Sequence, residues 1–382
     1  MKIVIYSNSP WSATGYGIQT WHLCKSLSEL GHIPVVVSNW GQDGAVANWE
    51  GIRVYPRGYD RPWGEDILVY AFAAEQPDLI ITLCNEWVLN PDLWAHLLSQ
   101  MPDCKLVSWT PCERLGLPTG VRDWFKRSSA LPLPMSRFGS DQLTEAGLEP
   151  LPVLPHCVDL GVFKPGPADR ERAGFAGFTA LSVGMNRGVD FTRKGHPSMF
   201  LAWRSFLDSH TGDAMLYCHT DRNPQHGADL GVLAKRCGLN DSDVTYAPPP
   251  SQYFSDAPDV LANLYRSADV LLMPSMGEGF GVPAVEAQAC GLPVIMSDFT
   301  AQTELCYGGW LVDGVRVWDP RQEGWLFVAD HRQITKRLTE AAGATSKQTN
   351  RLKAKAVAGS LRYGRERIRD NQLAQTISAL RG

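Results

Sequence analysis

Two glutamates in a glycine-rich stretch are the residues whose spacing points most directly to chemistry. Glu278 and Glu286 lie within 277–291, GEGFGVPAVEAQACG, where glycines precede a helix-forming run that Pro283 opens and Gly291 ends. The first turn of such a helix offers free N–H groups and a partial positive charge, which suit a phosphate. Because carboxylates repel phosphate, we expect both glutamates to bind hydroxyl groups. Phosphate and hydroxyls together indicate a nucleotide, a sugar, or both.

A second glycine turn lies near the start of the chain. The apolar run at 2–7 predicts a buried strand, and Gly15 and Gly17 fall where this strand turns into a helical stretch. The pair lacks the third glycine of the dinucleotide-binding fingerprint, and Ser38–Asn39 places no acidic residue after the next strand. A nicotinamide-dependent dehydrogenase is therefore disfavoured. A purely structural turn and a turn that approaches a ligand are both open interpretations.

Short apolar runs alternate with helical stretches, which predicts βαβ units and parallel sheets. The strand runs are 2–7, 33–38, 77–83, 105–109 and 130–135 in the first half, and 178–183, 214–219, 244–247, 268–274, 293–297 and 325–328 in the second. Between the halves, the proline- and glycine-rich stretch 150–167 is typical of a linker. We therefore expect two α/β domains, at 1–165 and 166–348, followed by a helical tail at 349–382.

Composition narrows the class of protein. The 382 residues carry a net charge of −4 and are 44% hydrophobic and 20% charged, as in a globular protein. A broad basic surface is not expected, so non-specific nucleic-acid binding is not the predicted main function. Nine scattered cysteines without a C-x-x-C pair favour reduced thiols over disulfides or a zinc site. With no signal peptide and no apolar run of the ~20 residues that span a bilayer, we expect a cytoplasmic protein.

Four motifs, in this order along the chain, resemble those of one family. They are GYG at 15–17, LPHCVDLGVF at 154–163, VGMNRGVDFTRKG at 183–195, and the E-x7-E pair within GEGFGVPAVEAQACGLPVIMSD. The chain thereby resembles the retaining GT-B glycosyltransferases of the family-four, or glycosyl transferases group 1, type over nearly its whole length. The resemblance implies an α/β fold with two Rossmann-like domains facing a cleft. It also implies that the tail at 349–382 packs back toward the first domain.

The resemblance further implies a division of roles around a nucleotide sugar bound mainly by the second domain. Glu286 would accept hydrogen bonds from the ribose, whereas Glu278 would meet the transferred sugar's hydroxyls and support charge near its anomeric carbon. Arg187 and Lys194 would hold the diphosphate and neutralise the leaving group without a metal. Arg193 competes with Lys194 for this role, because the interval from Arg187 to Lys194 is longer than usual in the family. The backbone groups expected near the phosphates belong to Gly15, Gly17, Gly279, Phe280, Gly281 and Val282.

Structural roles are the alternatives for several of these residues. Glu286 would otherwise be an ordinary exposed helix residue, and Arg187 or Arg193 would otherwise pair with Asp190. The basic residues of the 349–382 tail would usually form a solvated helix face, and weak contact with an anionic partner is the less common alternative.

One region departs from the family pattern. Many relatives carry a histidine or aspartate near the sugar, after the fourth strand of the first domain, where this chain has WTPCERLGLP at 109–118. Glu113 is the acidic residue of that segment, and we assign it to sugar or acceptor hydroxyls. A helix cap or a loop ion pair is its alternative role. His156 stands in the linker motif where the family usually has a small polar residue, and we interpret it as structural.

The reaction implied is transfer of a hexosyl group from a UDP- or GDP-sugar to an acceptor hydroxyl, with retention and with neither metal nor cofactor. The departing phosphate would take the acceptor's proton, so no dedicated protein base is needed. A glycan, a lipid-linked sugar, a small metabolite, a protein or a modified nucleic acid is each an open acceptor, and tryptophan-rich loops of the first domain would form its site. A sugar-nucleotide epimerase, a sugar phosphorylase and a non-catalytic nucleotide-sugar-binding protein are the alternatives.

Overall fold

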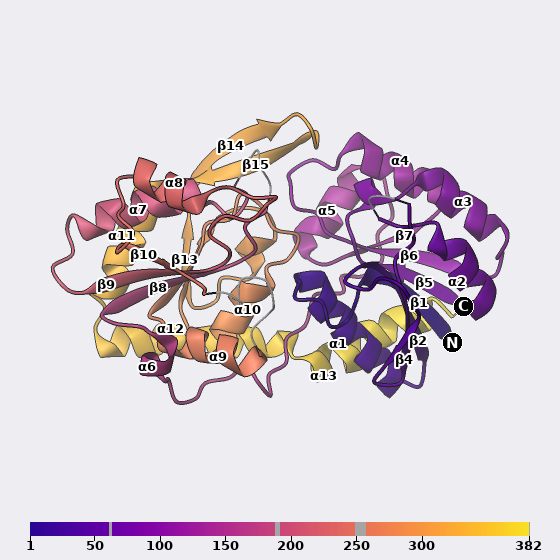
Figure 1. Cartoon of the computed structure of the whole chain (residues 1–382), viewed down its shortest axis with the longest axis horizontal. Coiled ribbons are helices and arrows are strands. Elements are labelled where there is room, and N and C mark those ends of the chain that lie inside the picture. The colour runs from indigo at the N-terminus through magenta and orange to yellow at the C-terminus, as the bar shows by residue number, and fades with distance from the viewer. Residues whose placement is uncertain (61–62, 188–191, 249–256, 382) are drawn as a thin grey trace. The chain divides into compact units, whose positions relative to one another are not determined.

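A seven-stranded and a six-stranded sheet organise the fold in this computed structural model, which describes residues 1–60, 63–187, 192–248 and 257–381. The chain divides into two compact units (Figure 1). Unit 1 comprises Met1–Cys157, Pro320–Gly324 and Arg365–Gly382, and unit 2 comprises Val158–Asp319 and Trp325–Gly364.

Unit 1 is built on the seven-stranded sheet, with strand order β3-β4-β2-β1-β5-β6-β7. Its strands are β1 (Lys2–Asn8), β2 (Ile33–Trp40), β3 (Ala47–Trp49), β4 (Ile52–Tyr55), β5 (Leu79–Thr82), β6 (Lys105–Thr110) and β7 (Leu131–Pro134). Its helices are α1 (Gly15–Glu29), α2 (Ile67–Glu75), η1 (Glu86–Val88), α3 (Pro91–Ser99), α4 (Thr119–Ser128), α5 (Arg137–Glu145), α13 (Arg365–Ile368), η4 (Arg369–Leu373) and α14 (Ala374–Ala379). Neighbouring strands pair in parallel, except β3 with β4.

Unit 2 is built on the six-stranded sheet, with order β10-β9-β8-β11-β12-β13 and parallel pairing throughout. Its strands are β8 (Phe178–Val183), β9 (Ala214–His219), β10 (Val244–Tyr246), β11 (Val270–Met273), β12 (Val294–Ser297) and β13 (Gly309–Val312), with β14 (Gly314–Asp319) and β15 (Gly324–Ala329) in a two-stranded sheet of their own. Its helices are α6 (Arg170–Ala173), α7 (His196–Leu207), α8 (Leu230–Arg236), α9 (Pro258–Ser267), α10 (Val282–Ala289), η2 (Thr300–Glu304), α11 (His331–Ala342), α12 (Ser346–Ser360) and η3 (Leu361–Tyr363). Figure 1 shows α7, α8 and α11 on one face of this sheet and α6, α9, α10 and α12 on the other.

The central strands explain why apolar runs predict this fold. Strands covered by helices on both faces must be apolar along their whole length rather than in alternation. In β1, the side chains of Ile3, Val4 and Ile5 are fully buried, and in β11 those of Leu271 and Leu272 are too. The predicted parallel α/β architecture with two Rossmann-like sheets is thereby confirmed.

Some strands differ from the prediction. The predicted strand runs pass from 33–38 to 77–83, yet the chain between them contains β3 and β4, which are short and extend the first sheet at one edge. The late apolar run at 325–328 forms a strand, but it pairs with β14 instead of joining the main sheet. Both differences arise where a strand is short or half-exposed, because the apolar signal of a buried strand is then weak.

The units do not follow the predicted boundaries at every point. Unit 1 ends at Cys157, eight residues before the boundary that was expected at 165. The tail is split, because α12 packs on α10 in unit 2 while the chain from Arg365 onward belongs to unit 1. There Arg365 donates to Glu29 Oε2 at 2.6 Å, and Arg369 also binds Glu29. Part of the tail's basic charge is therefore used in ion pairs within unit 1.

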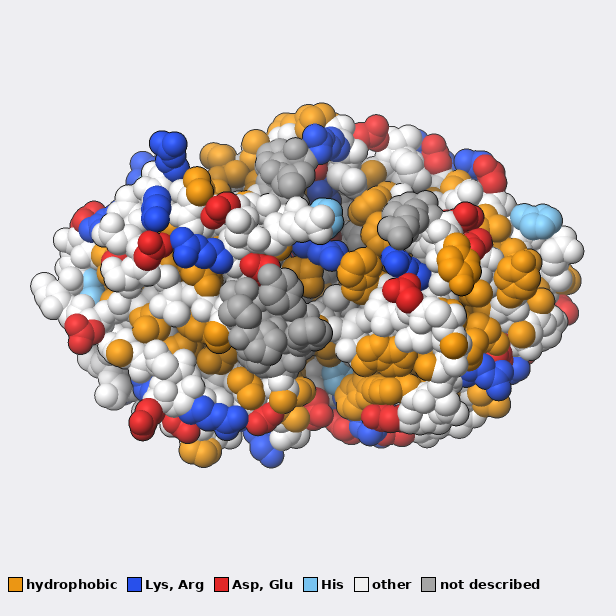
Figure 2. All heavy atoms as spheres, viewed as in Figure 1, with side chains coloured by type: hydrophobic (Ala, Val, Ile, Leu, Met, Phe, Trp, Pro, Cys, Tyr) orange, Lys and Arg blue, Asp and Glu red, His pale blue; other side chains and the backbone are white. Residues whose placement is uncertain are grey.

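The surface and the cysteines add two observations. Basic and acidic side chains are interspersed over the face drawn in Figure 2, in keeping with the small net charge of −4. All nine cysteines are free thiols. Among the described residues, no helix combines the length and the apolar character needed to cross a membrane.

Candidate active site

A buried strand, a glycine loop and a helix place the two glutamates, as the sequence predicts. β11 ends at Met273, and α10 begins at Val282 with Gly281 as its N-cap. Gly281 has a φ of +121°, and a Cβ there would lie 3.0 Å from Met273 Cε, so this position requires glycine. No side chain caps this helix end. Its first N–H groups therefore suit an anion.

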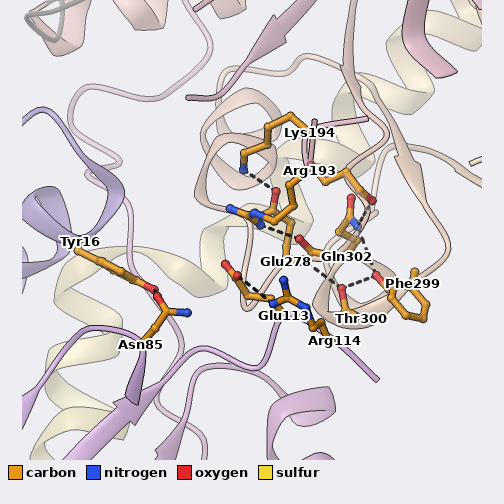
Figure 3. A network of polar contacts seen from close by, with 12 residues as sticks. Tyr16, Asn85, Glu113, Arg114, Arg193, Lys194, Glu278, Phe299, Thr300 and Gln302 are labelled. Atoms are coloured by element: carbon orange, nitrogen blue, oxygen red, sulfur yellow. Dashed lines mark hydrogen bonds and ion pairs between the residues drawn. The ribbon is translucent and has the colours of Figure 1, made fainter. Parts of the chain in front are cut away.

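Glu278 is held by two cations from the loop that precedes α7. Lys194 Nζ lies 2.6 Å from Glu278 Oε1, and Arg193 Nη1 lies 3.2 Å from Oε2 (Figure 3). Burial would raise the pKa of Glu278, but the charges of Lys194 and Arg193 outweigh it and bring the pKa to about 2. The carboxyl of Glu278 is therefore ionised throughout the neutral range, and it fixes both cations beside the glycine loop.

Close backbone contacts hold the turn that carries Arg193 and Lys194, here called the cationic turn, against the glycine loop before α10. Met276 N–H donates to the carbonyl of Arg193 at 2.7 Å, and Arg193 Nη1 donates to the carbonyl of Gly277 at 2.7 Å. Gly195 follows the two cations with a φ of +73°, and a Cβ there would overlap the carbonyl oxygen of Pro274. A glycine is thus needed for the turn to lie this close to the end of β11.

Two residues that the sequence did not single out support Glu278 from η2. Thr300 has a φ of +52°, and its hydroxyl accepts from Glu278 N–H at 3.0 Å. Gln302 donates to the carbonyl of Ser275 at 3.1 Å. A buried, β-branched residue with positive φ is strained, and such strain is concentrated at functional sites. Neither residue type carries a sequence signal for this role.

Glu286 lies on α10 with a different environment. Its side chain is buried, and Tyr265 Oη donates to Glu286 Oε2 at 2.9 Å. Burial raises the pKa of Glu286 to about 7, and the hydrogen bond from Tyr265 only partly opposes this shift. The alternative of an ordinary exposed helix residue is therefore wrong, because Glu286 is buried. Its ribose-binding role is still a prediction.

The first glycine turn has a structural explanation of its own. α1 begins at Gly15, and the side chain of its N-cap Thr14 accepts from Gly17 N–H at 3.0 Å. A Cβ on Gly17 would overlap the carbonyl oxygen of Ser12. The N–H that was expected to meet a phosphate is thus used by the helix cap in this structure.

Arg187 is the remaining basic residue of the predicted site loop. Arg187 lies exposed in the loop that follows β8, where its N–H donates to the carbonyl of Met185. Asp190, the proposed alternative partner, lies outside the described residues. The diphosphate-binding role of Arg187 stays a prediction.

Glu113 lies in a pocket of unit 1, at the carboxyl ends of β5 and β6. The pocket is lined by residues that include Glu86, Trp87, Glu113, Arg114 and Gln322. Glu113 and Arg114 approach each other to 4.0 Å (Figure 3). The carboxyl ends of parallel strands are where such sheets bind ligands. The geometry is compatible with the predicted hydroxyl-binding role and with the loop ion pair.

Glu86 is the residue of this pocket that sequence reasoning missed. Its side chain is buried, and Ser108 Oγ donates to Glu86 Oε1 at 2.6 Å. Burial raises the pKa of Glu86 to about 7, opposed by the hydrogen bond from Ser108. The signal available was an acidic residue four positions after the end of a buried strand, in LIITLCNEW.

His156 is buried in unit 1, and its ring meets that of Trp109 edge-on at 4.6 Å. Burial lowers the pKa of His156 to about 3, so the ring is neutral, as suits a structural residue. Within the described residues, no group of three or more His, Cys, Asp or Glu side chains is placed to hold a metal ion.

Comparison with known proteins relates this geometry to one family. Residues 191–338, which include the cationic turn and both glutamates, match the family model described as "Glycosyl transferases group 1". Over these residues the chain is therefore similar to the glycosyl transferases group 1 family. The matched segment thus contains Arg193, Lys194, Glu278 and Glu286 together.

Curated relatives match this chain over part of its length. The D-inositol 3-phosphate glycosyltransferase of Arthrobacter sp. (strain FB24) is 34% identical over 180 residues, which cover 46% of this chain and 41% of that protein. That of Segniliparus rotundus is 29% identical over 225 residues, covering 50% of this chain and 47% of that protein. The chain therefore spans less than half the length of these relatives.

Solved structures match over the whole chain. Sucrose-phosphate synthase from Thermosynechococcus elongatus has a TM-score of 0.73 at 18% identity and covers 99% of each chain. Anabaena HepE, solved in complex with UDP and glucose, has a TM-score of 0.72 at 18% identity and covers 99% of this chain and 100% of that one. This likeness shows that the fold is GT-B.

Proposed function

We propose that this protein transfers a hexosyl group from a nucleotide diphosphate sugar to an acceptor hydroxyl, with retention and without a metal or other cofactor. The observation that carries the proposal is the clamp of Lys194 and Arg193 on Glu278, directly before the uncapped start of α10. Two cations and free helix N–H groups suit a diphosphate. Two comparisons support a nucleotide-sugar donor, either a UDP- or a GDP-sugar. Residues 191–338 match the glycosyl transferases group 1 model, and the structural neighbour HepE was solved with UDP bound.

In the proposed reaction, the acceptor oxygen bonds to the anomeric carbon as the bond from that carbon to the diphosphate breaks. The acceptor's proton passes to the departing phosphate oxygen. Lys194 and Arg193 stabilise the negative charge that develops on the diphosphate, because they are oriented before the donor binds. Glu278 holds these cations through its ionised carboxyl, and in this proposal it also binds the hydroxyls of the transferred sugar. Glu286 binds the ribose.

The decisive experiment is a turnover assay of the purified protein with a panel of UDP- and GDP-sugars, with and without EDTA. We expect slow donor hydrolysis, or transfer to an added acceptor, that survives chelation. NMR of the released or transferred sugar should show retention of the anomeric configuration. Turnover that depends on added Mn²⁺ or Mg²⁺ would contradict the metal-independent mechanism, and donor binding without any turnover would indicate a binding protein.

The variant Glu278→Gln separates catalysis from binding in this assay. It removes the charge that orients both cations, so we expect turnover to fall at least ~100-fold with a smaller change in donor affinity. Glu340→Gln, an exposed glutamate of α11, is the control and should leave turnover unchanged. Equal turnover of wild type and Glu278→Gln would remove Glu278 from the mechanism.

A further inference from the structure

The pocket of unit 1 is assembled from three separated segments of the chain. Glu86 and Trp87 come from η1 after β5, Glu113 and Arg114 from the loop after β6, and Gln322 from the turn between β14 and β15. That turn is held in unit 1 by Thr119 N–H, which donates to the carboxylate of Glu323 at 3.0 Å. The cavity volume is about 30 Å³, enough for a single hydroxyl or hydroxymethyl group but not for a sugar ring.

An exposed indole lies at the rim of this cavity. Trp87 is 55% exposed, although its ring is braced by Trp63, whose centroid lies 6.2 Å away in an edge-on arrangement. A large, fixed and exposed aromatic face beside hydrogen-bonding side chains is typical of a ligand site. The apolar C–H face of a sugar ring can pack on such an indole while its hydroxyls reach polar groups.

The polar groups of the cavity suit hydroxyls better than phosphate. Glu86 and Glu113 can only accept from a hydroxyl when ionised, while Arg114 can donate and Gln322 can do both. Glu86 is fixed in place, because Ser108 donates to it and itself accepts from Thr82 Oγ1 at 2.9 Å. Arg114, the basic side chain of the lining, approaches Glu113 to 4.0 Å, so it leaves no excess positive charge for a phosphate.

We propose that this pocket recognises the acceptor as an uncharged sugar ring, which packs on Trp87 with one hydroxyl or hydroxymethyl group between Glu86, Glu113 and Gln322. The inference rests on the proposed transferase function, since it names the substrate class of that activity. It also separates this chain from the D-inositol 3-phosphate glycosyltransferases that it resembles, whose name specifies a phosphorylated acceptor. Gln322 is then a specificity residue supplied by the β14–β15 turn.

Binding to the full chain without a donor tests this inference independently of turnover. We would titrate methyl glucoside, maltotriose, glucose 6-phosphate and a hydroxymethylated DNA oligonucleotide by calorimetry and by tryptophan fluorescence. We expect methyl glucoside or maltotriose to bind at least ~10-fold more tightly than glucose 6-phosphate. Binding of maltotriose alone would identify the acceptor as the terminus of a glycan, and binding of methyl glucoside would identify it as a single sugar ring. Equal or tighter binding of the phosphorylated sugar, binding of the oligonucleotide alone, or no sugar binding overturns the inference.

Variants assign the binding to this pocket. Trp87→Ala, Glu86→Gln and Gln322→Ala should each weaken sugar binding about 10-fold or more, because each removes a packing face or a hydrogen-bonding group. Trp318→Ala is the matched control for Trp87→Ala, since Trp318 is 47% exposed and also paired edge-on with another tryptophan, Trp325. Unchanged affinity in both Trp87→Ala and Gln322→Ala would overturn the proposal. The absence of donor hydrolysis by the wild-type protein would instead contradict the proposed transferase function.

Discussion

Glu278 and Glu286 are almost equally buried, at 6% and 5% exposure, yet their carboxyls are held in opposite ways. Two cations contact Glu278 and keep its pKa at about 2, whereas Glu286 has a tyrosine hydroxyl and a pKa of about 7. Burial disfavours the charged form of both, and only nearby positive charge reverses that preference. One glutamate is therefore a permanent anion, and the other changes charge near neutral pH.

The variant Glu286→Gln should make the protein more stable and a poorer binder of nucleotide. The folded-state pKa of Glu286 lies above its ordinary value of 4.5, so its stabilising contribution is complete below pH 4.5 and is lost as the pH rises through 7. Above pH 8 we expect the variant to gain about 1–3 kcal/mol in free energy of unfolding relative to wild type. Urea denaturation from pH 4 to pH 9 measures this difference.

The same variant should weaken UDP or GDP binding about 10-fold at pH 8, because an ionised carboxylate accepts a ribose hydroxyl more strongly than an amide does. Glu171→Gln, an exposed glutamate of α6, is the control for both measurements. Lower stability together with unchanged nucleotide affinity would mean that Glu286 has a structural role.

At the scale of elements, the candidate site depends on how closely two turns approach each other. The turn before α7 carries Arg193 and Lys194, and the loop before α10 carries Glu278. Two glycines permit the approach: Gly195 lets the first turn lie against Pro274, and Gly281 lets the helix begin beside Met273. Backbone conformation and space, and not side-chain chemistry alone, thus position the ion pairs.

Gly195→Ala should therefore disturb the site without touching a charged residue. A methyl group at a φ of +73° is strained and overlaps a backbone carbonyl, so we expect a loss of about 1–3 kcal/mol in free energy of unfolding. Turnover should fall as well, because Lys194 is displaced from Glu278. Gly120→Ala in α4 is the control: its new methyl meets no atom within 4 Å, and it should be neutral or slightly stabilising. A stable, fully active Gly195→Ala protein would contradict this account.

At the scale of the whole molecule, unit 1 is completed by residues from the far end of the chain. Arg365 and Arg369 both bind Glu29 at the end of α1. Ile368, Leu373, Ile377 and Leu380 are buried there as well. The side chain of Arg365 is only 10% exposed, so its guanidinium depends on partners inside the protein.

Glu29→Ala should destabilise the protein more than the loss of a surface ion pair does. The substitution leaves the buried Arg365 with a missing acceptor, so we expect a loss of about 1–3 kcal/mol in free energy of unfolding. Arg332→Ala removes a pair whose arginine is 80% exposed, and it should change stability by about 0–1 kcal/mol. Urea denaturation of both variants makes the comparison, and equal losses would show that the contact at Glu29 is only a surface interaction.

Local sequence determined the elements and the central motif. Apolar runs without alternation indicate buried parallel strands, and the positions of glycine and proline mark where β11 ends and α10 begins. These are short-range properties, so the two α/β units and the placement of Glu278 and Glu286 on one loop and helix could be predicted. The apolar pattern that predicts a strand is weaker at short edge strands such as β3, because they bury little apolar surface.

Only the tertiary structure decided which side chains meet. Lys194 and Glu278 are 84 positions apart, and their contact depends on the approach of two turns that no local pattern encodes. The contact between Thr300 and Glu278 likewise depends on the fold, and the positive φ of Thr300 is imposed by its surroundings. The fold also brings Glu86 and Gln322 into one pocket. Long-range packing determines these contacts and, through burial and nearby charge, the protonation of each carboxyl. The sequence alone therefore names the candidate residues, while the fold determines their partners and charge states.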